Sequence, residues 1–234
     1  MKFYDVSVHN SKRFPDLRKL EDADFFMIRA GIGVSVDSFA AQYVEQCKGF
    51  RPWYPYWAVS PYYESQPQVI RCIETCASLA SICTPMKLVC ADLEIVKLSG
   101  VAYKPSRINK VWKEFCQHVP GIESIYTAAW VMHYLKGEDI SWMKAHPLHV
   151  ASYRAGAPYM TGLPWSSWTA WQYTSSPLDT NLGKDSFYGK LLGDPPLDIT
   201  VRRSAAIELL AKLPGPLSGP SSEAWTEALV DALL

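Results

Sequence analysis

Strand-like apolar segments alternate with helical segments through the first two thirds of this 234-residue chain. The strand segments are apolar over most of their length, which is typical of a parallel sheet with helices packed on its faces. The intervening segments have apolar residues at helical spacing. The expected strands are 3–8, 24–34, 52–59, 86–96 and 124–132, and the expected helices are 37–49, 67–82 and 106–119.

The pattern changes after the fifth of these strands. Residues 146–153, 168–175 and 197–203 predict three more strands, but the segments between them read as loops. Eight strands favour a closed barrel. We therefore expect an irregular α/β fold, a TIM-like (β/α) barrel with helices missing after the fifth strand. An open doubly wound sheet is the alternative, although the chain lacks the glycine-rich loop of a nucleotide-binding version.

The end of the chain differs in composition from the rest. Residues 204–213 predict a helix, and 214–222 form a Pro/Gly/Ser-rich linker before a short amphipathic segment. The expected organisation is one barrel domain over residues 1–213, followed by the linker and a short C-terminal helix over 214–234.

The charge balance argues against two classes of partner. Lys+Arg and Asp+Glu both number 23, so the formal net charge is zero and neither nucleic acid nor a membrane is the expected partner. No apolar run reaches the ~18 residues of a membrane-spanning helix. The first residues, MKFYDVSVHN, lack the apolar segment of a signal peptide. We expect a protein that stays in the cytoplasm of the producing cell until something else releases it.

Two acids, Asp92 and Glu94, stand inside the apolar segment KLVCADLEIV. Alternation along a strand would place them on one face, about 7 Å apart. Functional groups of parallel barrels lie at the C-terminal ends of the strands, where Asp5 of the first strand could approach the same mouth. Neighbouring carboxylates repel, so one of them keeps its proton near neutral pH, as a general acid needs. Glycoside cleavage uses such paired acids.

The same residues allow other interpretations. An Asp-x-Glu pair can bind Mg²⁺ or Ca²⁺ through its oxygens. It can also belong to a buried ion-pair network with an arginine such as Arg29.

Short sequence words between about residues 3 and 203 extend the pattern. In order they are YDVSVHN, FFMIRAGIG followed by Asp37, ADLE, IYTAAW, HVASY and WTAWQYTS. Together they resemble the glycoside hydrolase family 25 lysozymes, the muramidases of phage endolysins and of some microbes. The resemblance implies hydrolysis of the β-1,4 bond between N-acetylmuramic acid and N-acetylglucosamine in bacterial peptidoglycan. It implies no cofactor and no metal, and we expect a monomer that acts on the cell wall after release by a holin or by lysis.

The resemblance also implies roles for the acids. Glu94 would be the proton donor, and Asp92 and Asp5 would shape the charge of the site as stabiliser, base or nucleophile-like group. The nucleophile, an enzyme carboxylate or the acetamido group of the substrate, stays open. Sugar faces pack on aromatic rings. The expected substrate-binding residues, each of which could instead be a core residue, are Tyr56, Tyr126, Tyr153 and Trp171, with Arg29 orienting Asp5 or Asp92.

The resemblance also implies a last acid in an Asp-x-Asn-like word on the final strand. The word LDTN, with Asp179, matches the letters but follows Trp171 closely and reads as a turn. The word PLDITV, with Asp198, has the context of a strand before a helix, and KDSFYG (184–189) is a weaker option. We favour Asp198, with Asp179 as the alternative.

Two further functions remain open. The chain could be a carbohydrate-binding barrel that has lost activity, although the retained acids argue against this. It could also be a metal-dependent hydrolase that uses the same carboxylates.

Overall fold

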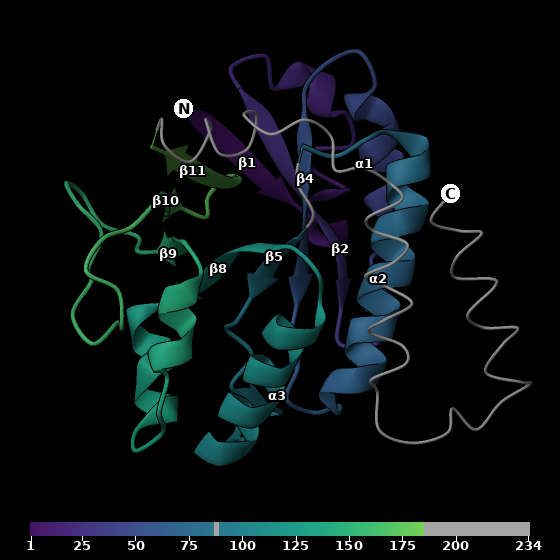
Figure 1. Cartoon of the computed structure of the whole chain (residues 1–234). Helices are drawn as coiled ribbons and strands as arrows, with labels where there is room; N and C mark the ends of the chain where they lie inside the picture. The colour runs from purple at the N-terminus through teal and green to yellow at the C-terminus, as the bar shows by residue number, and fades with distance from the viewer. Residues whose placement is uncertain (87–88, 185–234) are drawn as a thin grey trace, which may run out of the picture.

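The computed structural model describes residues 1–86 and 89–184, and these form a closed barrel with helices on one side (Figure 1). The barrel strands are β1 (Lys2–Val6), β2 (Phe25–Ile32), β4 (Trp53–Ala58), β5 (Val89–Asp92), β8 (Ile122–Ala128), β9 (Leu148–Ala151), β10 (Ala170–Thr174) and β11 (Asp179–Gly183). The short strands outside this ring are β3 (Ser35–Val36), β6 (Lys97–Leu98) and β7 (Val101–Ala102). The α-helices are α1 (Ala40–Cys47), α2 (Ser65–Ile82) and α3 (Pro105–His118), and the 3₁₀ helices are η1 (Val8–Asn10), η2 (Leu17–Lys19), η3 (Ala129–Leu135) and η4 (Ser141–Ala145).

The order of the strands closes the sheet into a ring. The neighbours run β1-β11-β10-β9-β8-β5-β4-β2, and β2 pairs back to β1. Strand β11 is antiparallel to both of its neighbours, while the other pairs of the ring are parallel. The predicted irregular α/β barrel is confirmed. From β8 to residue 184, the described chain has 3₁₀ helices and loops in place of α-helices.

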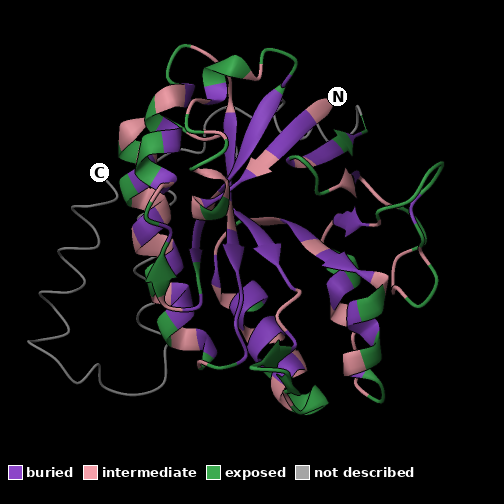
Figure 2. Ribbon diagram, turned by 180° about the vertical axis from the view of Figure 1, so that it is seen from behind, coloured by how far each residue is buried: buried purple, intermediate pink, exposed green. Residues whose placement is uncertain are grey.

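Helices cover only part of the outer surface of the barrel. Helices α1, α2 and α3 pack with their apolar faces against the outer side of β2, β4 and β5 (Figures 1 and 2). Large side chains such as Trp53, Trp57 and Trp112 are fully buried there. Outside β9 and β10, a loop takes the place of a helix. Its aromatic residues Trp165 and Trp168 cover Leu148, Val150 and Trp171.

Strand alternation divides the barrel interior into an apolar floor and a polar mouth. The floor contains Phe3, Phe25, Tyr54, Cys90 and Ala170, all completely buried. Two residues further along each strand, the side chain facing the interior reaches the C-terminal mouth. These second residues are Asp5, Met27, Tyr56, Asp92 and Gln172, and all of them line one cavity.

Three expected elements differ from the structure. The expected strand 124–132 ends at Ala128, and helix η3 begins at Ala129. Residues 178–181 were expected to form a turn, but Asp179 begins strand β11, because it pairs with β1 and the residues from Thr180 on pair with both β1 and β10. The expected strand 86–96 ends at Asp92, so Glu94 lies in the following loop. The expected strand 197–203, helix 204–213, linker and C-terminal helix, and the domain boundary at 213/214, lie outside the described residues. In the described part, no helix is long and apolar enough to cross a membrane.

Gly31 in β2 gives a test of this packing. A Cβ atom at Gly31 would overlap the indole ring of Trp57 and lie 2.5 Å from the backbone oxygen of Ser35. The ring cannot move aside easily, because it is fully buried and its Nε1 donates to the Gly33 oxygen at 3.2 Å. We expect Gly31→Ala to lower the free energy of unfolding by about 3 kcal/mol, measured by urea denaturation.

Gly49→Ala is the matched control. Its Cβ would have no atom within 4 Å, so only the positive φ of 66° is penalised, at about 1 kcal/mol. A Gly31→Ala protein as stable as the wild type would contradict the close packing of β2 against Trp57.

Candidate active site

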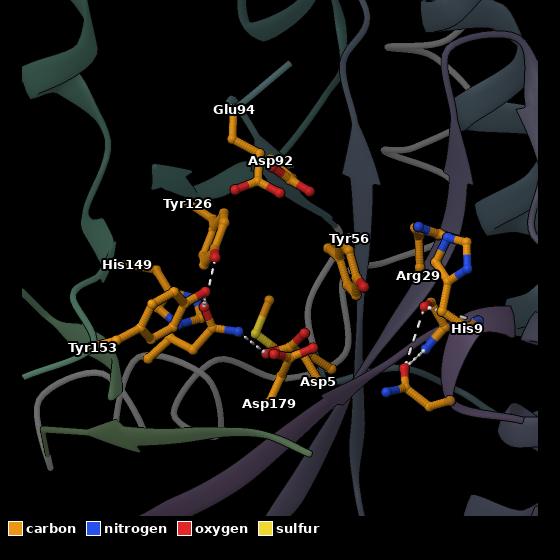
Figure 3. Close-up of a pocket in the computed structure, with 14 residues that line it drawn as sticks. Asp5, His9, Arg29, Tyr56, Asp92, Glu94, Tyr126, His149, Tyr153 and Asp179 are labelled. Atoms are coloured by element: carbon orange, nitrogen blue, oxygen red, sulfur yellow. Dashed lines mark hydrogen bonds between the residues drawn. The ribbon is translucent and has the colours of Figure 1, made fainter. Parts of the chain in front are cut away.

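A cavity of about 220 Å³ opens at the C-terminal mouth of the barrel (Figure 3). Acidic, aromatic and amide side chains from most of the barrel strands converge on it. Its lining residues are Asp5, Ser7, His9, Asn10, Met27, Arg29, Tyr56, Asp92, Glu94, Tyr126, His149, Tyr153, Gln172 and Asp179. The structure therefore brings the three predicted acids together, with Asp179 as a fourth.

Asp5 and Asp179 are direct cross-strand partners. In the antiparallel β1–β11 pair, the Cα atom of Asp5 is in register with that of Asp179. Directly opposite residues of antiparallel strands have Cβ atoms about 5 Å apart, so their carboxyl groups meet. Register, and not proximity in the sequence, creates this pair.

Two amide side chains hold one oxygen of Asp5. Gln172 Nε2 donates to Asp5 Oδ2 at 3.1 Å, and Asn181 Nδ2 donates to the same oxygen at 2.9 Å. The amide oxygen of Gln172 in turn accepts from the hydroxyls of Tyr126 at 2.6 Å and Tyr153 at 2.7 Å. The two amide donors are directed towards Asp5 and favour its charged form, while the two hydroxyls hold Gln172 in place.

The surroundings of Asp5 and Asp179 give the two carboxyl groups different pKa values. Burial raises the pKa of Asp5 to about 6, although hydrogen bonds from Asn181 and Gln172 oppose the rise. Burial, the charge of Asp5 and a hydrogen bond to Asp5 raise the pKa of Asp179 to about 8. Near neutral pH, Asp179 therefore carries the proton and Asp5 the negative charge.

Asp92 and Glu94 form a second acidic pair on the other side of the cavity (Figure 3). Burial, followed by the charges of Glu94 and Asp5, raises the pKa of Asp92 well above its ordinary value. Asp92 Oδ1 is buried and has no hydrogen-bond partner among the described residues. Burial and the charge of Asp5 also raise the pKa of Glu94. Of the two, Asp92 is buried and Glu94 is partly exposed at the end of the strand.

Arg29 pairs with a different acid from those expected. Its Nε donates to Asp37 Oδ2 at 2.8 Å, and not to Asp5 or Asp92. The Asp37 carboxylate also accepts from the backbone N–H groups of Val8 and Phe39. Asp37 thereby fixes the segment after β1, which brings His9 to the cavity. Arg29 still lines the cavity, and its positive charge lowers the pKa of Asp92 against the larger effect of burial.

His149 is a buried base in the wall of the cavity. Its Nε2 lies 2.7 Å from Asn181 Oδ1, and because Asn181 Nδ2 faces Asp5, the His149 nitrogen is the donor. Burial lowers the pKa of His149 to about 4, so the ring is neutral near pH 7. His149 thus fixes the orientation of the Asn181 amide that holds Asp5.

The predicted aromatic residues divide into two groups. Tyr56, Tyr126 and Tyr153 line the cavity, and their contact with a sugar stays a prediction. Trp171 does not line it: the ring faces the outer cluster with Leu148 and Val150, and its Nε1 donates to the Ser152 oxygen at 2.7 Å. Strand alternation points its neighbour Gln172 inwards instead.

The structure describes one of the two candidates for the last acid. The favoured Asp198 lies outside the described residues, and the alternative Asp179 lines the cavity from strand β11. The role of Asp179 in the chemistry stays a prediction. The sequence analysis missed Gln172, Asn181 and His149. Two signals were present: side-chain alternation in WQY, which turns Gln172 inwards when Trp171 faces outwards, and the Asp-x-Asn word, which contains Asn181.

Among the described residues, no group of three or more His, Cys, Asp or Glu side chains has a geometry that could hold a metal ion.

Comparisons with known proteins give a fold but no sequence match. No family model and no curated protein sequence matches the chain. The structure is similar to a family GH25 lysozyme from Aspergillus fumigatus, with a TM-score of 0.65 and 19% identity over 82% of this chain and 98% of that one. It is similar to a muramidase from Acremonium alcalophilum, with a TM-score of 0.63 and 16% identity over 83% and 100% of the two chains. The CTP1L endolysin gives 0.57 and 15% over 99% and 97%.

These likenesses define the class of fold. The chain has the irregular α/β barrel of the family 25 glycoside hydrolases, as the sequence words indicated. Its four-acid cavity lies at the C-terminal mouth of this barrel, the usual place of function in parallel barrels.

The Asp5–Asp179 pair predicts a dependence of stability on pH. The pKa of Asp179 is about 8 in the folded protein and about 3.8 in the unfolded chain, so its stabilising contribution is complete below about pH 4. That contribution is lost as pH rises towards 8. Asn is neutral throughout and can still donate to Asp5. We expect Asp179→Asn to raise the free energy of unfolding by about 1–3 kcal/mol at pH 8, with little change at pH 4, in urea denaturation.

Asp16→Asn is a control of the opposite sign. A hydrogen bond from Arg18 lowers the pKa of Asp16, so its contribution is present above the unfolded pKa and is lost as pH falls. Its replacement should therefore give no gain at pH 8. An Asp179→Asn protein that is less stable than the wild type at pH 8 would contradict the raised pKa of Asp179.

Proposed function

We propose that the protein is a peptidoglycan-degrading glycoside hydrolase that cleaves the β-1,4 bond between N-acetylmuramic acid and N-acetylglucosamine. The observation that carries the proposal is the pairing of acids: two pairs of carboxyl groups with raised pKa face one cavity. Glycoside cleavage needs one protonated and one ionised carboxyl group at the scissile bond. The likeness of the fold to a GH25 lysozyme and a muramidase supports the choice of bond and substrate.

Glu94 is the general acid in this proposal. Its raised pKa keeps a proton on the carboxyl group at higher pH than usual, ready for the glycosidic oxygen. Access supports Glu94 over Asp92, because Glu94 lies beyond the end of β5 and is partly exposed, whereas Asp92 is buried.

Asp5 supplies the negative charge in this proposal. The amides of Gln172 and Asn181 favour its ionised form, while Asp179 holds the proton of that pair. A carboxylate fixed in this way stabilises the positive charge of an oxocarbenium-like centre. If the acetamido group of the substrate attacks that centre, the carboxylate stabilises the positive charge that develops on the acetamido group. Burial and the charges of Glu94 and Asp5 raise the pKa of Asp92, which favours its neutral form beside them.

The tyrosines of the cavity suit a sugar substrate. Tyr56, Tyr126 and Tyr153 offer ring faces for the C–H groups of a sugar. The Tyr126 and Tyr153 hydroxyls are already bonded to Gln172, so their rings are held in place before a substrate arrives.

The biological setting is part of the proposal. The likeness to the CTP1L endolysin, over nearly the whole of both chains, supports a role in lysis of a bacterial host. In that role the enzyme would wait in the cytoplasm and reach the wall when a holin opens the membrane.

Mass spectrometry of digested peptidoglycan tests the reaction. We expect fragments with N-acetylmuramic acid at the reducing end, and we expect the same yield in EDTA. Acids with raised pKa bind protons in preference to metal ions near neutral pH, which is the reason for the EDTA result. Reducing-end N-acetylglucosamine or cleaved peptides would reject the muramidase. Loss of activity in EDTA with recovery in Mg²⁺ would favour the metal-dependent hydrolase, and inactivity under all conditions the carbohydrate-binding barrel.

Glu94→Gln tests the assignment of the acid. Gln keeps the shape of the side chain but cannot deliver a proton, so we expect release of reducing sugars to fall by at least about 100-fold. Urea denaturation should show an unchanged fold. Glu45→Gln, at an exposed ion pair with Lys48, is the matched control and should keep full activity. A Glu94→Gln rate near that of the wild type would refute the assignment and make Asp92 the next candidate.

A further inference from the structure

A second, larger hollow of about 550 Å³ adjoins the four-acid cavity. Tyr153 lines both, so the two spaces share a wall. One side of this groove is helix η3, which follows β8, and the other is the loop that follows β9. The groove therefore lies at the same end of the barrel as the cavity, and a ligand can extend from one into the other.

The walls of the groove are fixed and aromatic. Helix η3 is anchored by the buried side chains of Val131 and Leu135, and Tyr159 N–H donates to Ser152 Oγ at 3.0 Å. Despite this anchoring, Trp130, Tyr153 and Tyr159 are 48%, 58% and 48% exposed. A cluster of large exposed rings beside a cavity is typical of a binding surface.

The charge of the groove is opposite to that of the cavity. Among the described residues that line it there is no Asp or Glu, whereas Lys136 and His133 do line it. Arg154 stands over the Tyr159 ring at 6.0 Å. Neither Lys136 nor Arg154 forms an ion pair with an acid in residues 1–86 or 89–184. These cations are free to meet an anion that a ligand brings.

The proposed substrate carries its carboxylates in a particular place. The sugar rings of the glycan strand are uncharged, and the free carboxylates of peptidoglycan lie on the short peptides that branch from N-acetylmuramic acid. A sugar in the acidic cavity would thus place its peptide outside that cavity, next to the shared wall at Tyr153. The negative charge of Asp5 also disfavours peptide carboxylates within the cavity itself.

We propose that this groove binds the carboxylate-bearing stem peptide of peptidoglycan, with Lys136 as the charge partner and Trp130 and Tyr159 as apolar walls. The proposal rests on the proposed hydrolase function and deepens it, because it makes the peptide part of substrate recognition. Complementary charge at an exposed site adds modest affinity, so the effect belongs in KM and not in kcat.

The test compares two substrates and two lysine variants. The substrates are peptidoglycan freed of teichoic acid, and the same preparation with its carboxyl groups converted to amides. The variants are Lys136→Gln and, as the matched control, Lys144→Gln, which alters an exposed lysine of η4 outside the groove. Release of reducing ends gives kcat and KM for each combination.

For the wild type and Lys144→Gln, we expect kcat/KM to fall about 2- to 5-fold on amidation, through KM. Lys136→Gln should show the same loss on the free-carboxylate substrate and no further loss on amidation. Trp130→Ala should also raise KM on the substrate with free carboxylates.

Two results would overturn the proposal while leaving the hydrolase function intact. In the first, Lys136→Gln equals the wild type on the free-carboxylate substrate. In the second, Lys136→Gln loses equally on both substrates, or only Trp130→Ala matters, which would assign the groove to uncharged sugar. A wild type that releases no reducing ends from either substrate would instead reject the hydrolase function, and the peptide site with it.

Discussion

The antiparallel pairing of β11 with β1 is the interaction on which the site depends. It closes the barrel, and its register places Asp179 opposite Asp5 and Asn181 opposite Phe3. A slip of one residue would turn Asp179 out of the barrel and remove both an acid and the amide that holds Asp5. The remaining mouth residues come from parallel strands, so they reach the same end of the barrel without further adjustment.

The gathering of four acids has a thermodynamic cost, and the surrounding network limits it. Each carboxyl group has a pKa above its ordinary value because burial disfavours its charge. Two amides satisfy one oxygen of Asp5, a neutral His149 orients one of these amides, and Arg29 is neutralised by Asp37. The apolar floor below contains residues such as Phe3 and Tyr54, and their burial offsets the free-energy cost of burying the carboxyl groups. Ionisation of these acids at high pH lowers the free energy of unfolding, so the groups proposed for the chemistry are also a source of instability.

Much of the fold and part of the site followed from the sequence. Period and composition located most of the barrel strands and all three α-helices of the described chain, because these segments have strong local patterns. Asp5, Asp92 and Glu94 were selected as acids in apolar surroundings, and they do meet. Two selections relied on local pattern alone. Trp171 was selected because aromatic rings suit sugars, and Asp179 was ranked behind Asp198 because DTN resembles a turn. Both residues are positioned by pairing with distant strands, which local pattern does not reveal.

By itself, the sequence determined the alternation of strands and helices, the loss of helices after the fifth strand, and the placing of two acids at the end of an apolar strand. These follow from short-range periodicity and from the cost of burying charge. Only the tertiary structure decided the partners: Asp179 with Asp5, Arg29 with Asp37, and a cationic aromatic groove beside an acidic cavity. Of these, the Asp5–Asp179 pair joins opposite ends of the described chain, because barrel closure brings β1 and β11 together. Closure depends on the register of whole strands rather than on any single segment.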